Sequence, residues 1–231
     1  MAAFFADLLD NFPKRAFLEK VRVKFHYEET RAEELRAAAE EMLPFLYREA
    51  FWERGQVEAG SGAGGADLPG RRYERVVMSL GAGLDILQER YSGQGSLSKC
   101  YMLEVLAGEL LMQGCGAYNR YIGETADWHV ARYHFPGSEE AYPLEKLPGL
   151  LTGLTDRVTC NAAFCLLPKK SVAFAAELTQ DEKVRCEGIC AGCGNMHCVN
   201  RTADDSRIKQ MWARMADVPL NYGYSRILGR L

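Results

Sequence analysis

Four cysteines lie within thirteen residues near the end of the chain, at Cys186, Cys190, Cys193 and Cys198. The glycines between them, such as Gly192, let a short loop turn without steric cost, so the four thiols can converge on one point. Convergent thiols suit a metal ion or a cluster. We therefore take this loop as the candidate metal site.

The spacing of the four cysteines favours a 4Fe–4S cluster, because all four thiolates come from one loop, as in ferredoxin-like sequences. Structural zinc is the alternative, although it more often uses two Cys-x-x-Cys pairs that are far apart. A loop without metal is a third interpretation. The first three cysteines also match the radical S-adenosylmethionine enzymes, but those enzymes place the motif early, and here fewer than forty residues follow it.

The other cysteines fall in apolar segments, where a free thiol packs as a small hydrophobe; they are Cys100, Cys115, Cys160 and Cys165. For Cys160 and Cys165 a redox pair is a second interpretation. The first residues carry Asp7 and Asp10 and lack a basic leader, so we expect no signal peptide. Reduced thiols and a cytoplasmic location follow from this expectation.

The composition predicts one fairly large domain, or a domain with a small appendage, because 231 residues with 48% hydrophobic content can bury a sizeable core. A net charge of −3 argues against nucleic acid as a partner. The longest apolar stretch is interrupted by Glu104 and Glu109, so we expect no membrane span. We place the first domain at residues 1–182, with a flexible loop at 55–70, and the cysteine module with a closing helix at 183–231.

Hydrophobic spacing predicts a mixture of strands and helices. We expect strands at 21–27, 73–80, 157–160 and 171–178, and helices at 28–52, 83–91, 143–151 and 204–218. A long helix that either Ser96 or Ser98 caps should run through Asn119. Alternation predicts a further strand at 127–135, with Trp128, Val130, Arg132 and His134 on one face. The elements do not alternate regularly, which favours an α+β fold over a doubly wound sheet.

Three segments resemble the activation (reactivation) domain of vitamin B12-dependent methionine synthase, in its stand-alone form. The first is VVMSLGAGLDILQERYSGQGSLSKCYMLEVLAGELL, with Ser79-Leu80-Gly81 at its turn; the second is ARYHFPGSEEAYPLE; the third is FCLLPKKSVAF. They follow one another in the order of that family. The resemblance implies a mixed, largely antiparallel twisted sheet packed with helices. After Leu178 the chain departs from the family, because the cysteine module replaces the family's closing segment.

The resemblance also implies an S-adenosylmethionine site. It assigns Arg132 to the carboxylate of the ligand, for which a two-pronged guanidinium is suited. The backbone around Phe135, Pro136 and Gly137 would line the adenosine, and Glu109 would meet the amino or sulfonium charge. An exposed helix carboxylate is the alternative interpretation of Glu109.

The function that the resemblance implies is an accessory role in methyl transfer. The chain would support reductive reactivation of a cobalamin-dependent methionine synthase or another corrinoid protein, with the cluster as a possible relay from an electron donor protein. The alternative is a non-catalytic binding module with a structural zinc site. An enzyme that acts alone is the least favoured class, since no nucleophile–base pair or paired carboxylates are visible.

Overall fold

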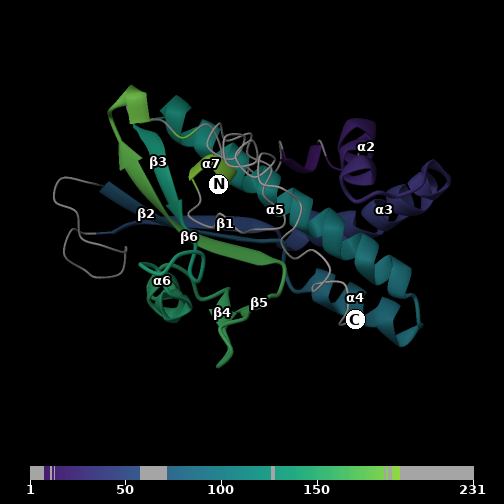
Figure 1. The fold of residues 1–231 in the computed structure, drawn as a ribbon. Helices are drawn as coiled ribbons and strands as arrows, with labels where there is room; N and C mark the ends of the chain where they lie inside the picture. Colours follow the sequence, from purple (N-terminus) through teal and green to yellow (C-terminus); the bar gives the residue numbers. More distant parts are fainter. Residues whose placement is uncertain are drawn as a thin grey trace, which may run out of the picture. The chain divides into compact units, whose positions relative to one another are not determined.

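The computed structural model describes residues 8–10, 12, 14–57, 72–125, 128–184, 186 and 189–192 (Figure 1). The chain divides into a unit of residues 1–196 and a unit of residues 197–231. All described residues belong to the first unit. The expected closing helix at 204–218 lies outside them, as does most of the expected loop at 55–70.

A four-stranded sheet with the order β1-β2-β6-β3 forms the centre of the first unit. Its strands are β1 (Phe51–Val57), β2 (Arg72–Ser79), β6 (Ser171–Thr179) and β3 (His129–His134). Every neighbouring pair is antiparallel. A two-stranded antiparallel ribbon joins β4 (Thr159–Cys160) and β5 (Leu166–Leu167). The predicted α+β class with a largely antiparallel sheet is confirmed.

Helices cover both faces of this sheet (Figure 1). One face packs on the long helix α5 (Leu97–Thr125), and the larger hydrophobic core lies between them. The opposite face packs on α6 (Leu147–Leu151), which follows the 3-10 turn η2 (Leu144–Lys146). The two faces, called here the α5 face and the α6 face, therefore have separate cores.

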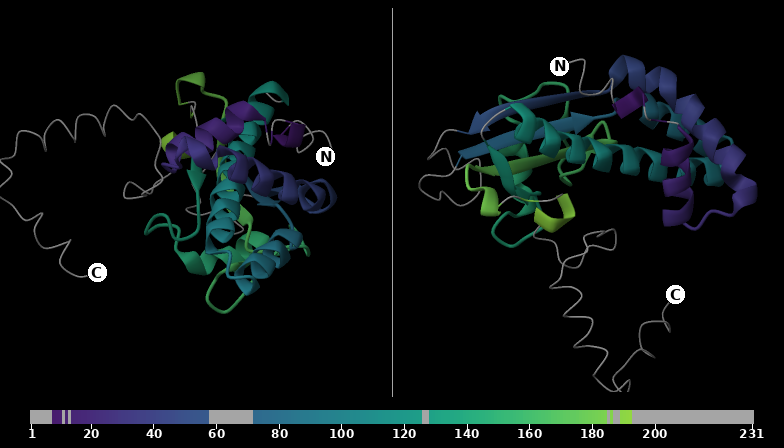
Figure 2. Two further views of the ribbon diagram at one scale, coloured as in Figure 1. Left: turned by 90° about the vertical axis from the view of Figure 1, so that its right-hand side faces the viewer. Right: turned by 90° about the horizontal axis from the view of Figure 1, so that it is seen from above.

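Three more helices pack with α5. They are α2 (Arg15–Lys24), α3 (Ala32–Glu49), which follows the turn η1 (Glu29–Arg31), and α4 (Gly83–Gly93). Figure 2 shows α2 and α3 beside the first half of α5. The short segments η3 (Glu182–Val184) and α7 (Ile189–Gly192) end the described chain. No helix among the described residues is long and apolar enough to cross a membrane.

The predicted strand at 21–27 is wrong, because helix α2 runs through Lys24. The alternation of Val21, Val23 and Phe25 suggested a buried strand face. In the structure Val23 is 58% exposed, whereas Phe17, Leu18 and Val21 are buried. Their spacing is that of a helix face, which packs against the core.

The predicted helix at 28–52 is correct only as far as Glu49, where α3 ends. Pro44 lies within this helix. Strand β1 begins at Phe51 and includes Gly55, which we expected to open a loop; Gly55 pairs with Arg75 of β2. Trp52 lies on the α5 face, and its burial favours the strand over a continued helix.

Gly81 forms the turn between β2 and α4. Its φ of +91° is a conformation that glycine adopts at little steric cost. A Cβ at this position would lie 2.3 Å from the Cβ of Glu49. The Glu49 carboxylate accepts a hydrogen bond from the backbone N–H of Gly83 at 2.7 Å. The Ser79-Leu80-Gly81 turn is thereby attached to the end of α3.

Candidate functional site

Four polar side chains form a cluster at β3, on the α6 face of the sheet. Arg132 pairs with Glu139, and Nδ1 of His134 lies 2.7 Å from Oε1 of the same carboxylate. Nε2 of His134 lies 3.5 Å from Oε2 of Glu177. The Arg132 side chain is 47% exposed, while the other three are largely buried. We call these residues the Arg132 cluster.

A β-bulge in β3 places this cluster. Val130 pairs with Leu178, but Arg132 pairs with Glu177, so Ala131 is an extra residue in the strand. The bulge turns Val130 toward the α5 core, and Arg132 and His134 share the α6 face with Glu177. The prediction that Val130, Arg132 and His134 lie on one face is therefore wrong.

The turn after β3 brings Glu139 back onto the cluster. Gly137 has a φ of +80°, and its backbone N–H donates to the carbonyl of Tyr142 at 2.8 Å. The Ser138 hydroxyl donates to the carbonyl of Phe135 at 2.7 Å. The ring of Phe135 packs against Phe174, which belongs to the α5 core. Pro136 and Gly137 thus lie close to Arg132 in the chain, whereas the Phe135 ring faces the other side of the sheet.

Aromatic rings surround His134 on the α6 face. The centroid of Tyr73 lies 6.2 Å from that of His134, and the centroid of Tyr142 lies 5.8 Å from it. Burial raises the pKa of Tyr142 to about 12, so this phenol stays neutral at ordinary pH. The Tyr142 hydroxyl is buried and finds no hydrogen-bond partner among the described residues.

The chemistry of the Arg132 cluster suits a small molecule that carries both charges. The Arg132 guanidinium can bind a carboxylate through two parallel hydrogen bonds. Glu139 and Glu177 can face a cation. In the structure Glu139 already holds Arg132, so a ligand carboxylate would have to displace it.

Glu109 lies on α5 and is not joined to the Arg132 cluster. Its carboxylate is 2% exposed, with Oε1 2.6 Å from Nζ of Lys20 and Oε2 2.9 Å from Nζ of Lys24. Burial opposes its ionisation, but the hydrogen bonds of both lysines outweigh burial, and the pKa of Glu109 lies below its ordinary value. Both oxygens therefore connect α5 to α2, and the exposed carboxylate considered from the sequence is in fact buried.

The first two cysteines of the predicted metal site are described. Cys186 is buried, its backbone N–H donates to the carbonyl of Val130 at 2.8 Å, and its carbonyl accepts from Nδ2 of Asn119 at 3.1 Å. Cys190 lies on α7. Cys193 and Cys198 lie outside the described residues. Within the described part of the chain, no three Cys, His, Asp or Glu side chains come together as metal ligands do.

Cys115 is a neighbour of these cysteines that sequence reasoning missed. It lies on α5, one turn before Asn119, and is 1% exposed. Burial raises the pKa of its thiol to about 12, and the charge of Cys190 adds to this effect. Burial also raises the pKa of Tyr133, with smaller contributions from the thiols of Cys115 and Cys186. The spacing of Cys115 and Asn119, which puts both on one helix face, is the only sequence signal for this arrangement.

The chain was compared with models of known protein families and with curated proteins, and neither comparison finds a match.

Proposed function

We propose that this chain is a cytoplasmic accessory protein of a cobalamin-dependent methyltransferase such as methionine synthase. It binds S-adenosylmethionine and supports the reductive remethylation of the cobalamin. In such proteins the Co(I) form is occasionally oxidised to inactive Co(II), and methylation traps the product of its reduction. The proposal depends on the three segments that resemble the activation domain.

The observation that supports the proposal best is the adjacency of these segments in the fold. Their strands β2, β6 and β3 are neighbours in one sheet, although the segments are far apart in the sequence. The Leu80 N–H donates to the carbonyl of Lys170 at 2.8 Å, and the hydroxyl of Ser171 donates to that of Ser79 at 2.8 Å. If the chain shares the fold of that family, we expect the three segments to follow the family's order and to pack together in one unit.

S-adenosylmethionine has a carboxylate, an ammonium group and a sulfonium, and the Arg132 cluster offers a partner for each sign of charge. Arg132 would hold the carboxylate and Glu139 would turn from Arg132 to the cationic side. Tyr73 and Tyr142 are buried on the same face and pack against His134 behind these charged groups. We leave Glu109 out of this ligand site, because both of its oxygens are engaged by lysines of α2.

For the cysteine module we propose a 4Fe–4S cluster held by Cys186, Cys190, Cys193 and Cys198. Such a cluster exchanges single electrons, which is the chemistry that reduction of Co(II) requires. The backbone contacts of Cys186 fix one end of the loop against β3 and α5. An electron donor protein would then be a second partner.

Ligand binding tests the first half of the proposal. We expect S-adenosylmethionine to bind the purified chain in equilibrium dialysis and Arg132→Gln to weaken binding at least about tenfold, because a charge-assisted bidentate contact is lost. Arg36→Gln is the matched control, since Arg36 is an exposed arginine of α3 that pairs only with glutamates in the described part of the chain. Absence of binding by the wild-type chain, or equal binding by Arg132→Gln, would refute the site.

Metal analysis tests the second half. After anaerobic purification we expect iron and sulfide with broad absorbance at about 400 nm. The double variant Cys186→Ser/Cys190→Ser should lose this absorbance, and Cys165→Ser, at an exposed cysteine, should keep it. Zinc in place of iron would contradict the electron relay and favour a binding module with a structural zinc.

The methyl transfer itself is tested by the absorbance of cobalamin. A cobalamin-dependent methionine synthase that lacks a working activation domain, poised in the Co(II) form, should regain methylcobalamin when this chain, S-adenosylmethionine and a reductant are added. Arg132→Gln should fail in the same mixture. Methylcobalamin that forms equally well without the chain would overturn the accessory role.

A further inference from the structure

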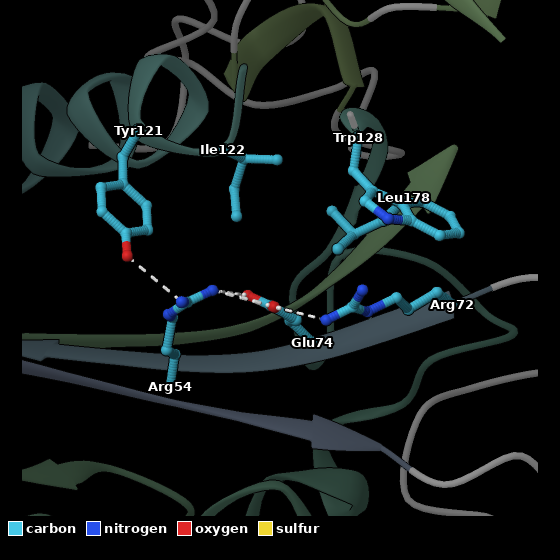
Figure 3. Close-up of a pocket in the computed structure, with 7 residues that line it drawn as sticks. All are labelled: Arg54, Arg72, Glu74, Tyr121, Ile122, Trp128 and Leu178. Carbon is cyan, nitrogen blue, oxygen red and sulfur yellow. Dashed lines mark hydrogen bonds and ion pairs between the residues drawn. The ribbon is translucent and has the colours of Figure 1, made fainter. Parts of the chain in front are cut away.

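A second candidate site lies on the α5 face, opposite the Arg132 cluster. It is a pocket of about 150 Å³ beside the last turns of α5. Three charged side chains form one wall, with the carboxylate of Glu74 between the guanidinium groups of Arg54 and Arg72 (Figure 3). The facing wall is apolar or aromatic and is made by Tyr121, Ile122, Trp128 and Leu178.

The carboxylate of Glu74 is satisfied by its neighbours. Nη1 of Arg54 donates to both oxygens at 3.0 Å, and the buried hydroxyl of Tyr118 donates to Oε2 at 3.1 Å. Nη2 of Arg54 donates to the hydroxyl of Tyr121 at 3.2 Å. Glu74 and Arg54 thus form an ion pair without net charge, and each makes hydrogen bonds to its neighbours. The net positive charge of the pocket therefore comes from Arg72.

Arg72 is held in place but is poorly hydrogen-bonded. Its Nη2 lies 3.7 Å from Oε1 of Glu74, beyond hydrogen-bond distance, and its guanidinium lies 5.3 Å from the centroid of Trp128. Its Nε is buried and has no hydrogen-bond partner in the described part of the chain. A guanidinium carries five N–H donors, so Arg72 presents unused donors and one net positive charge at the pocket.

These features define the class of ligand. Two arginines and one glutamate leave the pocket with one net positive charge, which selects an anion with one charge, and a planar guanidinium suits a carboxylate best. The apolar wall opposite requires an organic body on that carboxylate. A cavity of about 150 Å³ holds one six-membered ring, as an engineered cavity of this size binds benzene.

We infer that this pocket binds a small organic monocarboxylate, with the carboxylate on Arg72 and the apolar body against Ile122, Trp128 and Leu178. The site is separate from the one in the proposed function, because Glu74 and Arg132 lie on opposite faces of the sheet. Phosphate is disfavoured, since it offers nothing to the apolar wall and carries more charge than Arg72 can balance.

Benzoate is the probe that tests this inference, with benzamide as its neutral counterpart. The indole N–H signal of Trp128 in a ¹H–¹⁵N spectrum, assigned with Trp128→Phe, reports on the pocket. We expect benzoate to shift this signal with a Kd of about 1 mM. Arg72→Met keeps the apolar stem and should weaken binding at least about tenfold, whereas Arg72→Lys keeps the charge and should lose less.

Each control separates one explanation from another. Arg36→Gln should bind benzoate as the wild type does, and an unchanged far-ultraviolet spectrum should show that Arg72→Met is folded. Benzamide that binds as well as benzoate would overturn the inference, because the arginine would then be irrelevant. Phosphate that competes at equal affinity would overturn the organic ligand, and a wild-type chain that benzoate leaves unchanged would overturn the site.

The two proposals fail independently. Arg72→Met should leave S-adenosylmethionine binding unchanged, and Arg132→Gln should leave benzoate binding unchanged. Competition between benzoate and S-adenosylmethionine would assign the pocket to the site of the proposed function and would overturn the second site.

Discussion

Replacement of Glu109 by glutamine tests whether this residue serves the fold or a ligand. Its carboxylate is 2% exposed, with Lys20 at 2.6 Å and Lys24 at 2.9 Å. Glu109→Gln keeps the size of the side chain and removes its charge. The structure predicts a loss of stability without a loss of ligand affinity, because both oxygens connect α5 to α2.

The expected size of the loss follows from the two lysines. The Lys20 side chain is 59% exposed, and an ion pair with so exposed a partner contributes about 0.2–1 kcal/mol. Lys24 is only 24% exposed, and a hydrogen bond between charged groups there is worth about 1.5–3 kcal/mol. The amide retains part of this, so we expect the free energy of unfolding to fall by about 2 kcal/mol. The melting temperature should fall by about 4–8 °C.

Urea denaturation at two pH values is the assay. The folded pKa of Glu109 lies below its ordinary value of 4.5, so its ionisation stabilises the fold above that pH. This contribution disappears as the pH falls through the folded pKa. The gap between the wild type and Glu109→Gln should therefore be full at neutral pH and shrink in acid.

The matched control is Glu40→Gln, at a carboxylate of α3 that is 49% exposed and pairs with Arg36 at 2.5 Å. We expect it to change the unfolding free energy by less than about 0.5 kcal/mol. Equal stability of Glu109→Gln and the wild type, or a gap that persists unchanged in acid, would refute the reasoning. A loss of S-adenosylmethionine affinity at unchanged stability would restore the ligand role that the resemblance implied for Glu109.

Two substitutions and one labelling experiment test other parts of the fold. Tyr118→Phe removes a buried hydroxyl that donates to the Glu74 carboxylate at 3.1 Å. Urea denaturation should show that the free energy of unfolding falls by about 1–3 kcal/mol. An unchanged free energy would mean that water replaces the hydroxyl. Gly81→Ala would place a Cβ 2.3 Å from the Cβ of Glu49, at a residue whose φ is +91°. We therefore expect the melting temperature to fall by at least about 4 °C. A variant that melts at the wild-type temperature would contradict the conformation of this turn. In limited alkylation followed by mass spectrometry, the exposed Cys165 should be modified well before Cys115. Cys115 is buried, and burial raises the pKa of its thiol to about 12. Equal rates of modification would contradict the burial of Cys115.

Local patterns were enough for the elements whose periodicity is long or uninterrupted. The strand expected at 73–80 is β2, the strand expected at 171–178 is β6, and the long apolar helix is α5. β2 and β6 are short segments with β-branched or aromatic residues, as strands prefer, whereas the apolar stretch of α5 is too long for a strand. The expected end of α5 at Asn119 was early, since the helix continues to Thr125.

Other elements depend on contacts that local patterns do not carry. The bulge at Ala131 is set by the pairing of β3 with β6, so the alternation around it predicted the wrong face for Val130. Helix α2 and a short strand both fit the apolar residues near Val21, and packing against α5 decides between them. Local propensity is too weak to override such packing.

Some residues of the candidate site could likewise be predicted from the sequence, and others could not. Arg132 and the Pro136-Gly137 turn follow from the resemblance, since they form one continuous motif. Glu177 and Glu139 could not be predicted, because they meet Arg132 only through sheet register and the return of the chain after Gly137. Cys115 packs in the core, as the sequence predicts, and only the fold brings it near the other thiols.

Asn119 joins three parts of the molecule with one side chain. Its Nδ2 donates to the carbonyl of Cys186, and its Oδ1 accepts from the hydroxyl of Tyr133 on β3. The same strand carries Arg132 and His134 on its other face. This amide therefore connects the start of the proposed metal loop to the strand that carries the proposed S-adenosylmethionine site, and a change at that loop would reach the strand through Asn119.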